Sequence, residues 1–198
     1  MLNIVLFGPP GAGKGTQSEN LINKYNLTHI STGDLFRKHL KEGTELGKLA
    51  QQYMDDGNLV PDSVVIDMVD DKINNTSGVN GFIFDGFPRT VTQAEALDEL
   101  MDKKGHPISG MIALEVPFEE LKKRLLLRGK DSGRADDQSE EKINNRIKVY
   151  LEETVPVAKY YKSQNKYRAV DGVGTIDGIF DNICLEVEKL QSQSSKSS

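Results

Sequence analysis

The chain has 198 residues, enough for one to one and a half ordinary domains with a sizeable hydrophobic core. Its 25 Lys and Arg residues and 30 Asp and Glu residues give a net charge of −5, which argues against a general nucleic-acid-binding protein. The single cysteine, Cys184, excludes a disulfide framework and a cysteine-rich zinc site. No apolar run approaches the ~18–20 residues of a membrane span, and the N-terminal run MLNIVLF predicts a strand rather than a signal peptide. We therefore expect a cytoplasmic protein without nucleic-acid or membrane partners.

Short apolar runs alternate with amphipathic stretches along the chain. The apolar runs predict strands at residues 3–7, 28–30, 81–84, 111–116 and 167–170. Apolar residues at helical spacing predict helices near residues 14–25, 33–42, 62–74, 91–103, 118–128, 139–163 and 176–190. This alternation indicates an α/β fold, with a parallel five-stranded sheet covered by helices on both faces. Such sheets bind ligands beyond the carboxyl ends of their strands.

Two stretches interrupt this alternation. Residues 31–60 insert a mostly helical segment after the second strand, and residues 128–137 form a short, glycine-containing, highly charged segment. We expect a single domain over residues 1–198, in which these stretches form a helical insertion and a lid on the sheet. The core would then comprise residues 1–30, 61–127 and 138–190. The polar, Ser-rich residues 191–198 predict a frayed tail.

The first predicted strand leads into a glycine-rich loop, Gly8-Pro9-Pro10-Gly11-Ala12-Gly13-Lys14-Gly15-Thr16, which is followed by a predicted helix. A loop of this kind points backbone N–H groups at an anion, and the helix N-terminus adds roughly half a positive charge. Its spacing fits a P-loop of the NTPase type, in which Lys14 would reach the outer phosphates. Gly15 occupies the place of the usual magnesium-binding Ser or Thr, so we expect Mg²⁺ to be held more through water. Position 16 is not glycine, so a dinucleotide fingerprint is not met.

Two further motifs lie in or beside the insertion. Ser31-Thr32-Gly33-Asp34-Leu35-Phe36-Arg37 follows the second strand, and Ser31 or Thr32 can cap the next helix. Arg37 is poorly placed for the helix dipole, which favours an anion-binding role for this side chain. The third motif, Gly57-Asn58-Leu59-Val60-Pro61, fits a plain turn that opens the next helix as well as it fits a binding site.

A fourth motif follows the third strand, where Asp85-Gly86-Phe87-Pro88-Arg89 is followed by Gln93. An apolar strand that ends in an aspartate is typical of the acidic nucleotide motif, which binds Mg²⁺ directly or through water. Arg89 can bind a phosphate as a bidentate fork. The amide of Gln93 can donate and accept at once, which suits an adenine edge, although a lone Gln is usually solvated surface.

The fifth cluster consists of the charged lid and its flanks: Arg124, Arg128, Arg134, Asp136, Asp137 and Arg146. Arg124 and Arg128 lie four residues apart on one helix face, where like charges repel unless an anion lies over them. A solvated charge run is the ordinary interpretation of such a sequence. Gly129 and Gly133 within the run favour a lid that closes.

These motifs run in one order over roughly residues 1–190. In sequence, order and spacing they resemble the adenylate kinases, which belong to the nucleoside monophosphate kinase family. The resemblance implies reversible transfer of the terminal phosphoryl group of MgATP to AMP, giving two ADP, in adenine nucleotide homeostasis and nucleotide biosynthesis. It also identifies residues 31–60 as an NMP-binding insertion and residues 128–137 as a short lid.

The resemblance implies a role for each motif residue. ATP would contact Gly11, Ala12, Gly13, Lys14, Gly15, Thr16, Arg124, Arg128 and Gly174. AMP would contact Thr32, Arg37, Asn58, Leu59, Val60, Gly86, Phe87, Pro88, Arg89, Gln93, Arg134 and Arg146. The catalytic groups would be Lys14, Arg89, Arg128, Arg134 and Arg146. Asp136 and Asp137 would be lid carboxylates that orient Arg134 and Arg146.

Cofactor and partners follow from the same resemblance. Mg²⁺ would accompany ATP, with Asp85 binding it through water. The lid lacks the long insertion of many bacterial relatives and with it four zinc-binding positions, so no structural zinc is expected. The partners would be the small molecules ATP, AMP and ADP, and the chain would act as a monomer.

Phosphoryl transfer demands alignment and neutralisation of charge rather than covalent work by the protein. No general base is needed, because the acceptor phosphate is already ionised, and the three histidines, His29, His39 and His106, lie outside the motifs. Arginines suit this task because they stay charged and fork onto oxygens. Residues 31–60 and 128–137 could close over the substrates and exclude water.

Three alternatives compete with this interpretation. A catalytically inactive, interaction-only relative would be expected to lose Lys14 or the lid arginines, and this chain has them all. A UMP/CMP kinase shares the fold, but Thr32 and Gln93 favour AMP, since pyrimidine-specific relatives tend to have Ala and Asn at the matching places. A switch-type NTPase would need a base-reading Asn-Lys-x-Asp, and the candidate Asn165-Lys166-Tyr167-Arg168 has Arg in place of the Asp.

Overall fold

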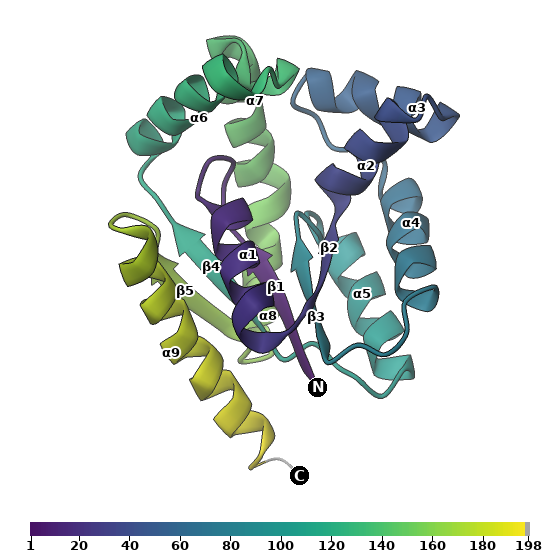
Figure 1. Ribbon diagram of the computed structural model, residues 1–198, viewed down its shortest axis with the longest axis vertical. Helices are drawn as coiled ribbons and strands as arrows, with labels where there is room; N and C mark the ends of the chain where they lie inside the picture. Colours follow the sequence, from purple (N-terminus) through teal and green to yellow (C-terminus); the bar gives the residue numbers. More distant parts are fainter. Residues whose placement is uncertain (197–198) are drawn as a thin grey trace.

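The computed structural model describes residues 1–196 of the chain, and in these residues a parallel sheet lies between two layers of helices (Figure 1). The strand order is β2-β3-β1-β4-β5, and every neighbouring pair is parallel. The strands are β1 (Leu2–Phe7), β2 (Thr28–Ser31), β3 (Gly81–Asp85), β4 (Gly110–Glu115) and β5 (Tyr167–Asp171). The predicted α/β class and the five predicted strands are therefore confirmed, with ends that differ by one residue.

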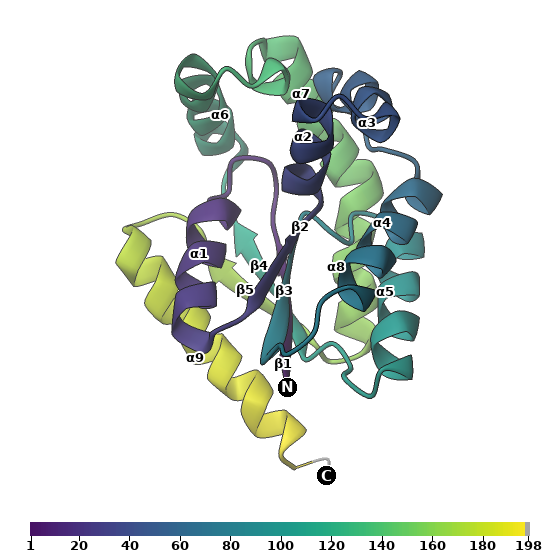
Figure 2. The same ribbon diagram turned by 45° about the vertical axis from the view of Figure 1, so that its right-hand side comes forward.

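Two sets of helices cover the two faces of the sheet (Figures 1 and 2). One face carries α1 (Lys14–Tyr25) and α9 (Ile176–Ser194), and the other carries α4 (Asp62–Asn74), α5 (Val91–Lys103) and α8 (Val155–Ser163). Successive strand residues point to opposite faces, so Ile4 and Leu6 pack against the first set while Val5 and Phe7 pack against the second. Burial on both faces explains why the strands are continuous apolar runs.

The predicted insertion forms a helical hairpin that stands beyond one end of the sheet (Figure 2). It contains α2 (Thr32–Lys41) and α3 (Glu45–Asp55), which begin at the N-caps Ser31 and Thr44. The helices pack closely because α3 has a glycine at the contact: a Cβ on Gly47 would lie 2.3 Å from the backbone nitrogen of Leu40. The helical character expected of residues 31–60 is confirmed for these two elements.

The charged segment lies beside this hairpin and is more regular than expected. Helix α6 (Phe118–Ser132) continues four residues past its predicted end, and it stops at Gly133, whose φ is +66°. A 3₁₀ turn (Ala135–Asp137) then leads to α7 (Glu140–Val149). Half of the predicted lid, residues 128–132, is therefore the last turn of a long helix.

The single helix predicted over residues 139–163 is interrupted. A π-helical segment (Tyr150–Thr154) separates α7 from α8, because Pro156 has no N–H to continue the regular ladder. At the C-terminus, α9 continues to Ser194, so the first four residues of the expected frayed tail, 191–194, are helical. The end of that tail, residues 197–198, lies outside the described residues.

The strand register brings the carboxyl ends of the central strands together. Asp85, the last residue of β3, pairs with Leu6 of β1 on one side and Ser31 of β2 on the other. The loop after β1, the start of α2 and the loop after β3 therefore meet at one edge of the sheet. In residues 1–196, no helix is long and apolar enough to cross a membrane.

Candidate active site

A cleft of about 710 Å³ lies at this edge, between the sheet, the α2–α3 hairpin and the α6–α7 corner. Most of the residues that the sequence analysis selected line it: Gly11, Gly13, Lys14, Gly15, Thr16, Arg37, Asn58, Asp85, Gly86, Arg89, Arg124, Arg128, Arg134, Asp136 and Arg146. They come from all five motifs of the sequence. The strands and their loops therefore place one cationic cleft where the sequence predicted it.

The glycine-rich loop wraps around the start of α1. Gly11 and Gly13 have φ values of +83° and +95°, which strongly favour glycine. A side chain on Gly11 would also meet α6, since its Cβ would lie 2.9 Å from Cγ of Leu125. Gly13 caps α1 without a side-chain hydrogen bond, so the first N–H groups of the helix face the cleft, where an anion can accept from them.

Lys14 is folded back onto this loop. Its Nζ donates to the carbonyl oxygens of Gly8 at 2.9 Å and Pro9 at 3.0 Å. Burial lowers the pKa of Lys14 to about 7; nearby Asp85 opposes this shift, while Arg89 and other arginines of the cleft reinforce it. A phosphate brought to Lys14 would add further negative charge and favour its charged form.

Asp85 contacts a residue that the sequence analysis had set aside. Nε2 of His29, on β2, lies 3.3 Å from Oδ2 of Asp85, on the neighbouring strand. The hydrogen bond to Asp85 raises the pKa of His29. Burial opposes ionisation of Asp85, but His29 and Lys14 outweigh it and lower the pKa of this carboxyl group. Asp85 is therefore an ionised carboxylate at the floor of the cleft.

Arg89 is held in place by its backbone and by its Nε atom. Nε donates to the carbonyl oxygen of Gly86 at 2.8 Å, and Thr154 donates to the carbonyl oxygen of Arg89, also at 2.8 Å. Burial and Arg146 lower the pKa of Arg89 to about 10, which still leaves it charged at neutral pH. The π-helical segment thus supports the loop that carries this guanidinium, because Thr154 belongs to it.

The two aspartates of the lid hold one arginine of the lid and one of α7. Asp137, with no exposed side-chain surface, accepts from Nη2 of Arg128 at 3.0 Å and also pairs with Arg146. Arg146 pairs with Asp136 as well, at 3.1 Å. Burial lowers the pKa of Arg146, and the two aspartates oppose that shift. Carboxylates from the 3₁₀ turn therefore orient guanidinium groups from α6 and α7.

Arg134 differs from these neighbours: the expectation that Asp136 and Asp137 orient it is not met, because they pair with Arg128 and Arg146 instead. Within residues 1–196, its guanidinium makes no ion pair or hydrogen bond, although it lines the cleft. Burial lowers the pKa of Arg134, and Arg37 and Arg128 act in the same direction. Arg37 is held more loosely, by one ion pair of 2.6 Å to Asp34 in the same helix. Asp137 and Asp136 oppose the lowering of the Arg134 pKa from a distance. Among the described residues, the cleft therefore contains a guanidinium group that no carboxylate pairs directly.

A smaller pocket opens from the cleft between α2, α3 and the loop after β3. It is lined by four of the six remaining AMP candidates: Thr32, Leu59, Val60 and Gln93. Thr32 donates to the carbonyl oxygen of Gly86 at 2.9 Å, which ties the start of α2 to the β3 loop. Val60 and Gln93 are buried, so this pocket has an apolar wall and one buried amide.

Five candidates do not line these two spaces. Ala12 belongs to the glycine-rich loop, but its side chain is buried. Asp137 is also buried, behind the arginines that it holds. Phe87 and Pro88 border a narrow cavity beneath the glycine-rich loop. Gly174 lies in the β5–α9 loop, and Nη2 of Arg124 donates to the carbonyl oxygen of Gly172 in that loop at 3.1 Å.

Sequence reasoning missed four residues that shape the site: His29, Asp62, Asn145 and Thr154. Nδ2 of Asn145, on α7, donates to Oδ1 of Asn58 at 3.1 Å and joins the insertion to the lid side of the cleft. Asp62 accepts from Gln93 at 2.9 Å. These contacts join residues up to 87 positions apart, so spacing along the chain does not reveal them. Of the four residues, His29 alone carried a signal in the sequence, which is its position in the second strand.

Comparison with known proteins identifies the family. The family model described as adenylate kinase matches residues 6–166. The chain is 53% identical to an adenylate kinase of Bacteroides thetaiotaomicron and 56% identical to one of Flavobacterium psychrophilum, each over 190 residues. These alignments cover 96% of this chain and 100% of each relative. An adenylate kinase of Porphyromonas gingivalis is 46% identical over 194 residues, covering 98% of this chain and 100% of the relative.

Proposed function

The chain belongs to the adenylate kinase family, which reversibly transfers the terminal phosphoryl group of ATP to AMP, and we propose which of its residues perform each part of that reaction. The observation that carries the assignment is the single cleft that joins the glycine-rich loop to the pocket around Gln93. ATP would enter at the loop and AMP at the pocket. The groups between them are mostly arginines.

The ATP end is built around the N-terminus of α1. The phosphates accept from backbone N–H groups of Gly11, Ala12, Gly13, Lys14, Gly15 and Thr16, and Nζ of Lys14 moves from its present carbonyl partners to the phosphate oxygens. Arg124 and Arg128 lie on the α6 wall of the cleft, over the phosphates and the base. Gly174 offers backbone groups to the adenine from the loop that Arg124 already contacts.

The AMP end is built around the smaller pocket. Thr32, Leu59, Val60 and Gln93 surround the base, and Arg37 and Arg89 bind the phosphate. Asn58, Gly86, Phe87 and Pro88 complete this end of the site through the loops that carry them. The amide of Gln93 reads the base edge, because it is the buried amide in this pocket.

Transfer itself requires positive charge along the path of the phosphoryl group. Arg134 makes no ion pair within residues 1–196 and is available to contact the transferred group, while Arg128 and Arg146 are pre-oriented by Asp136 and Asp137. Charge that is oriented before the reaction needs no reorganisation during it. No general base is required, since the acceptor phosphate of AMP is already an anion.

Members of this family use ATP with Mg²⁺, and the donor set of the cleft fits that ion. Mg²⁺ is commonly bound by one or two carboxylates together with phosphate oxygens and water. Asp85 is such a carboxylate: it is ionised, lines the cleft and lies near Lys14. We propose that Asp85 holds Mg²⁺ through water, and that the ion neutralises phosphate charge.

Water must be kept from the phosphoryl group, or ATP would be hydrolysed. We propose that the α2–α3 hairpin and the lid of residues 128–137 close over the two nucleotides. The hydrogen bond between Asn145 and Asn58 supports this, because it already joins the two sides of the cleft. One chain supplies every residue of the proposed site, which favours a monomer, and the two nucleotides favour a cytoplasmic location.

A coupled assay of ADP production tests the proposal. With MgATP present, ADP should form at a rate that depends on AMP and saturates with it, and AMP should be preferred to CMP and UMP. ADP production from ATP alone, without dependence on AMP, would refute the proposed reaction. A preference for CMP or UMP would instead assign the pocket to a pyrimidine nucleotide. Size-exclusion chromatography with light scattering should give a monomer mass.

A further inference from the structure

The side-chain amide of Gln93 is held at both of its ends. Its Oε1 accepts from the backbone N–H of Arg89 at 2.7 Å, and its Nε2 donates to Oδ1 of Asp62 at 2.9 Å. The same carboxylate oxygen accepts from the hydroxyl group of Thr90, also at 2.9 Å. Gln93 is only 2% exposed and Asp62 is partly buried, so the amide itself is shielded from water.

The two partners of the amide have fixed polarity. A backbone N–H can only donate, and an ionised carboxylate can only accept. Rotating the amide of Gln93 by half a turn would place its Nε2 against the N–H of Arg89 and its Oε1 against the carboxylate of Asp62. Both contacts would then be repulsive and buried. The orientation of this amide is therefore determined by its surroundings, without a ligand.

One N–H and one lone pair of the amide remain for a ligand, and Gln93 lines the AMP pocket. Adenine offers an acceptor at N1 and a donor at N6, which match these groups. Hypoxanthine, a purine of nearly the same shape, offers a donor at N1 and an acceptor at O6. An amide that could turn would bind either base equally well, whereas a fixed amide binds only one of them.

We propose that Asp62 is a positioning residue, which locks the amide of Gln93 so that the pocket accepts a 6-aminopurine monophosphate and rejects the 6-oxo analogue. This inference rests on the proposed binding of AMP in the pocket. Asp62 itself lines neither the cleft nor the pocket. It would act through Gln93, with Thr90 holding the carboxylate from the start of α5.

The test is Asp62→Asn, which keeps the shape of the side chain. An Asn side chain can turn its own amide to donate to Oε1 of Gln93, so a rotated Gln93 would meet only one repulsive contact instead of two. The kcat/KM for AMP divided by that for inosine monophosphate should fall about ten-fold. The variant Asp62→Ala, which removes the acceptor, should move this ratio in the same direction.

Cytidine monophosphate provides an internal control. Cytosine offers an acceptor at N3 and a donor at N4, in the same order as adenine, so locking the amide cannot separate these two bases. The ratio of AMP to CMP activity should therefore stay unchanged in Asp62→Asn. A general loosening of the pocket would instead change both ratios together, and this outcome would overturn the positioning role.

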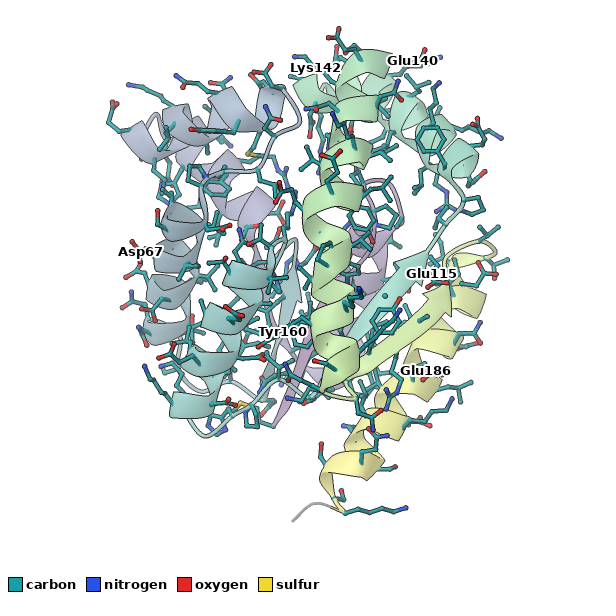
Figure 3. The ribbon with its side chains drawn as sticks, turned by 180° about the vertical axis from the view of Figure 1, so that it is seen from behind. Asp67, Glu115, Glu140, Lys142, Tyr160 and Glu186 are labelled. Atoms are coloured by element: carbon teal, nitrogen blue, oxygen red, sulfur yellow. The ribbon has the colours of Figure 1, made fainter. Side chains whose placement is uncertain are left out.

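Asp67→Asn is the matched control on the same helix, since Asp67 is exposed and lies on the outer side of α4 (Figure 3). It should leave both ratios at the wild-type values. If Asp62→Asn also keeps the wild-type preference for AMP over inosine monophosphate, the inference fails while the proposed reaction stands. If the wild-type chain does not use AMP, the proposed reaction itself fails.

Discussion

Asp137 accepts a hydrogen bond from Nη2 of Arg128 at 3.0 Å, although its side chain has no exposed surface at all. A buried carboxylate is stable only when it is paired, and here Arg146 is its second partner. Asp137 is therefore a structural counter-ion for two arginines and not a group that faces the substrates. Its removal should affect stability before it affects chemistry.

We expect Asp137→Ala to lower the free energy of unfolding by about 3–5 kcal/mol, because it leaves two guanidinium groups close together with too little negative charge. Chemical denaturation would measure this loss. Asp131→Ala removes an exposed carboxylate from the end of α6 and is the control, with little expected change. Equal effects of the two variants would show that burial of the Asp137 pair contributes nothing.

Arg134 should matter for turnover far more than for binding. In the part of the chain that the structure describes, its guanidinium makes no hydrogen bond or ion pair, and it would engage the phosphoryl group only during transfer. Arg134→Ala should therefore lower kcat about 10³-fold or more. Calorimetric titration should find ATP affinity nearly unchanged. Arg168→Ala removes the arginine that lies outside the motifs and should leave kcat at the wild-type value. Parallel losses of kcat and ATP affinity in Arg134→Ala would contradict a role confined to the transition state.

Lys14 should take up a proton when ATP binds at alkaline pH. Because its pKa is lowered to about 7, Lys14 is mostly neutral at pH 8 in the free protein, whereas bound phosphate favours its charged form. Titration calorimetry at pH 8, in buffers that differ in ionisation enthalpy, should detect uptake of about one proton. At pH 6 the uptake should vanish, because Lys14 is already charged. In Lys14→Arg, where the side chain stays protonated, a persisting uptake at pH 8 would assign the proton to another group.

Alanine substitutions at two glycines of the insertion can distinguish the effect of backbone strain from the effect of contact with α7. Gly57 and Gly43 have φ values of +74° and +70°, so alanine at either position should cost about 1 kcal/mol of stability. A Cβ on Gly57 would lie 2.6 Å from Cγ of Arg146 and 3.0 Å from the carbonyl oxygen of Lys142, whereas one on Gly43 would meet nothing within 4 Å. Lys142 is seen near the top of α7 in Figure 3.

Gly57→Ala should therefore also raise the KM for AMP about ten-fold, by pushing the insertion away from Arg146. Gly43→Ala should leave that KM unchanged. Steady-state kinetics at saturating ATP would compare the two variants. The same KM in both would mean that contact between the insertion and α7 does not contribute to AMP binding.

Local patterns were sufficient for most of the fold. Helix α1 (Lys14–Tyr25) and helix α4 (Asp62–Asn74) have the predicted ends, because a glycine-rich loop and a proline mark their starts. The sequence does not predict the end of α6, because the glycine-containing, charged run of residues 128–137 is typical of a lid. Gly129 lies inside the helix for another reason. A Cβ at this position would lie 2.2 Å from the carbonyl oxygen of Asp137, so the close approach of the 3₁₀ turn requires a glycine.

The net charge of −5 describes the surface of this protein and not its cleft. Six of the seven arginines lie in or beside the motifs, and all six line the cleft. Their convergence could be expected from sequence, because the carboxyl ends of parallel strands meet at one edge of a sheet. The sequence could not predict which arginines form ion pairs with Asp137, because that depends on the path of the chain around this residue.

The sequence by itself determined the parallel sheet, the phosphate loop and the identity of most cleft residues, because each of these depends on a short, continuous run of residues. Only the tertiary structure decided the partners: His29 beside Asp85, Asp137 between two arginines, and Asp62 behind Gln93. Hydrogen bonds and ion pairs depend on distances of about 3 Å between side chains from different elements. Spacing along one chain does not specify such distances, and the packing of helices against the sheet does.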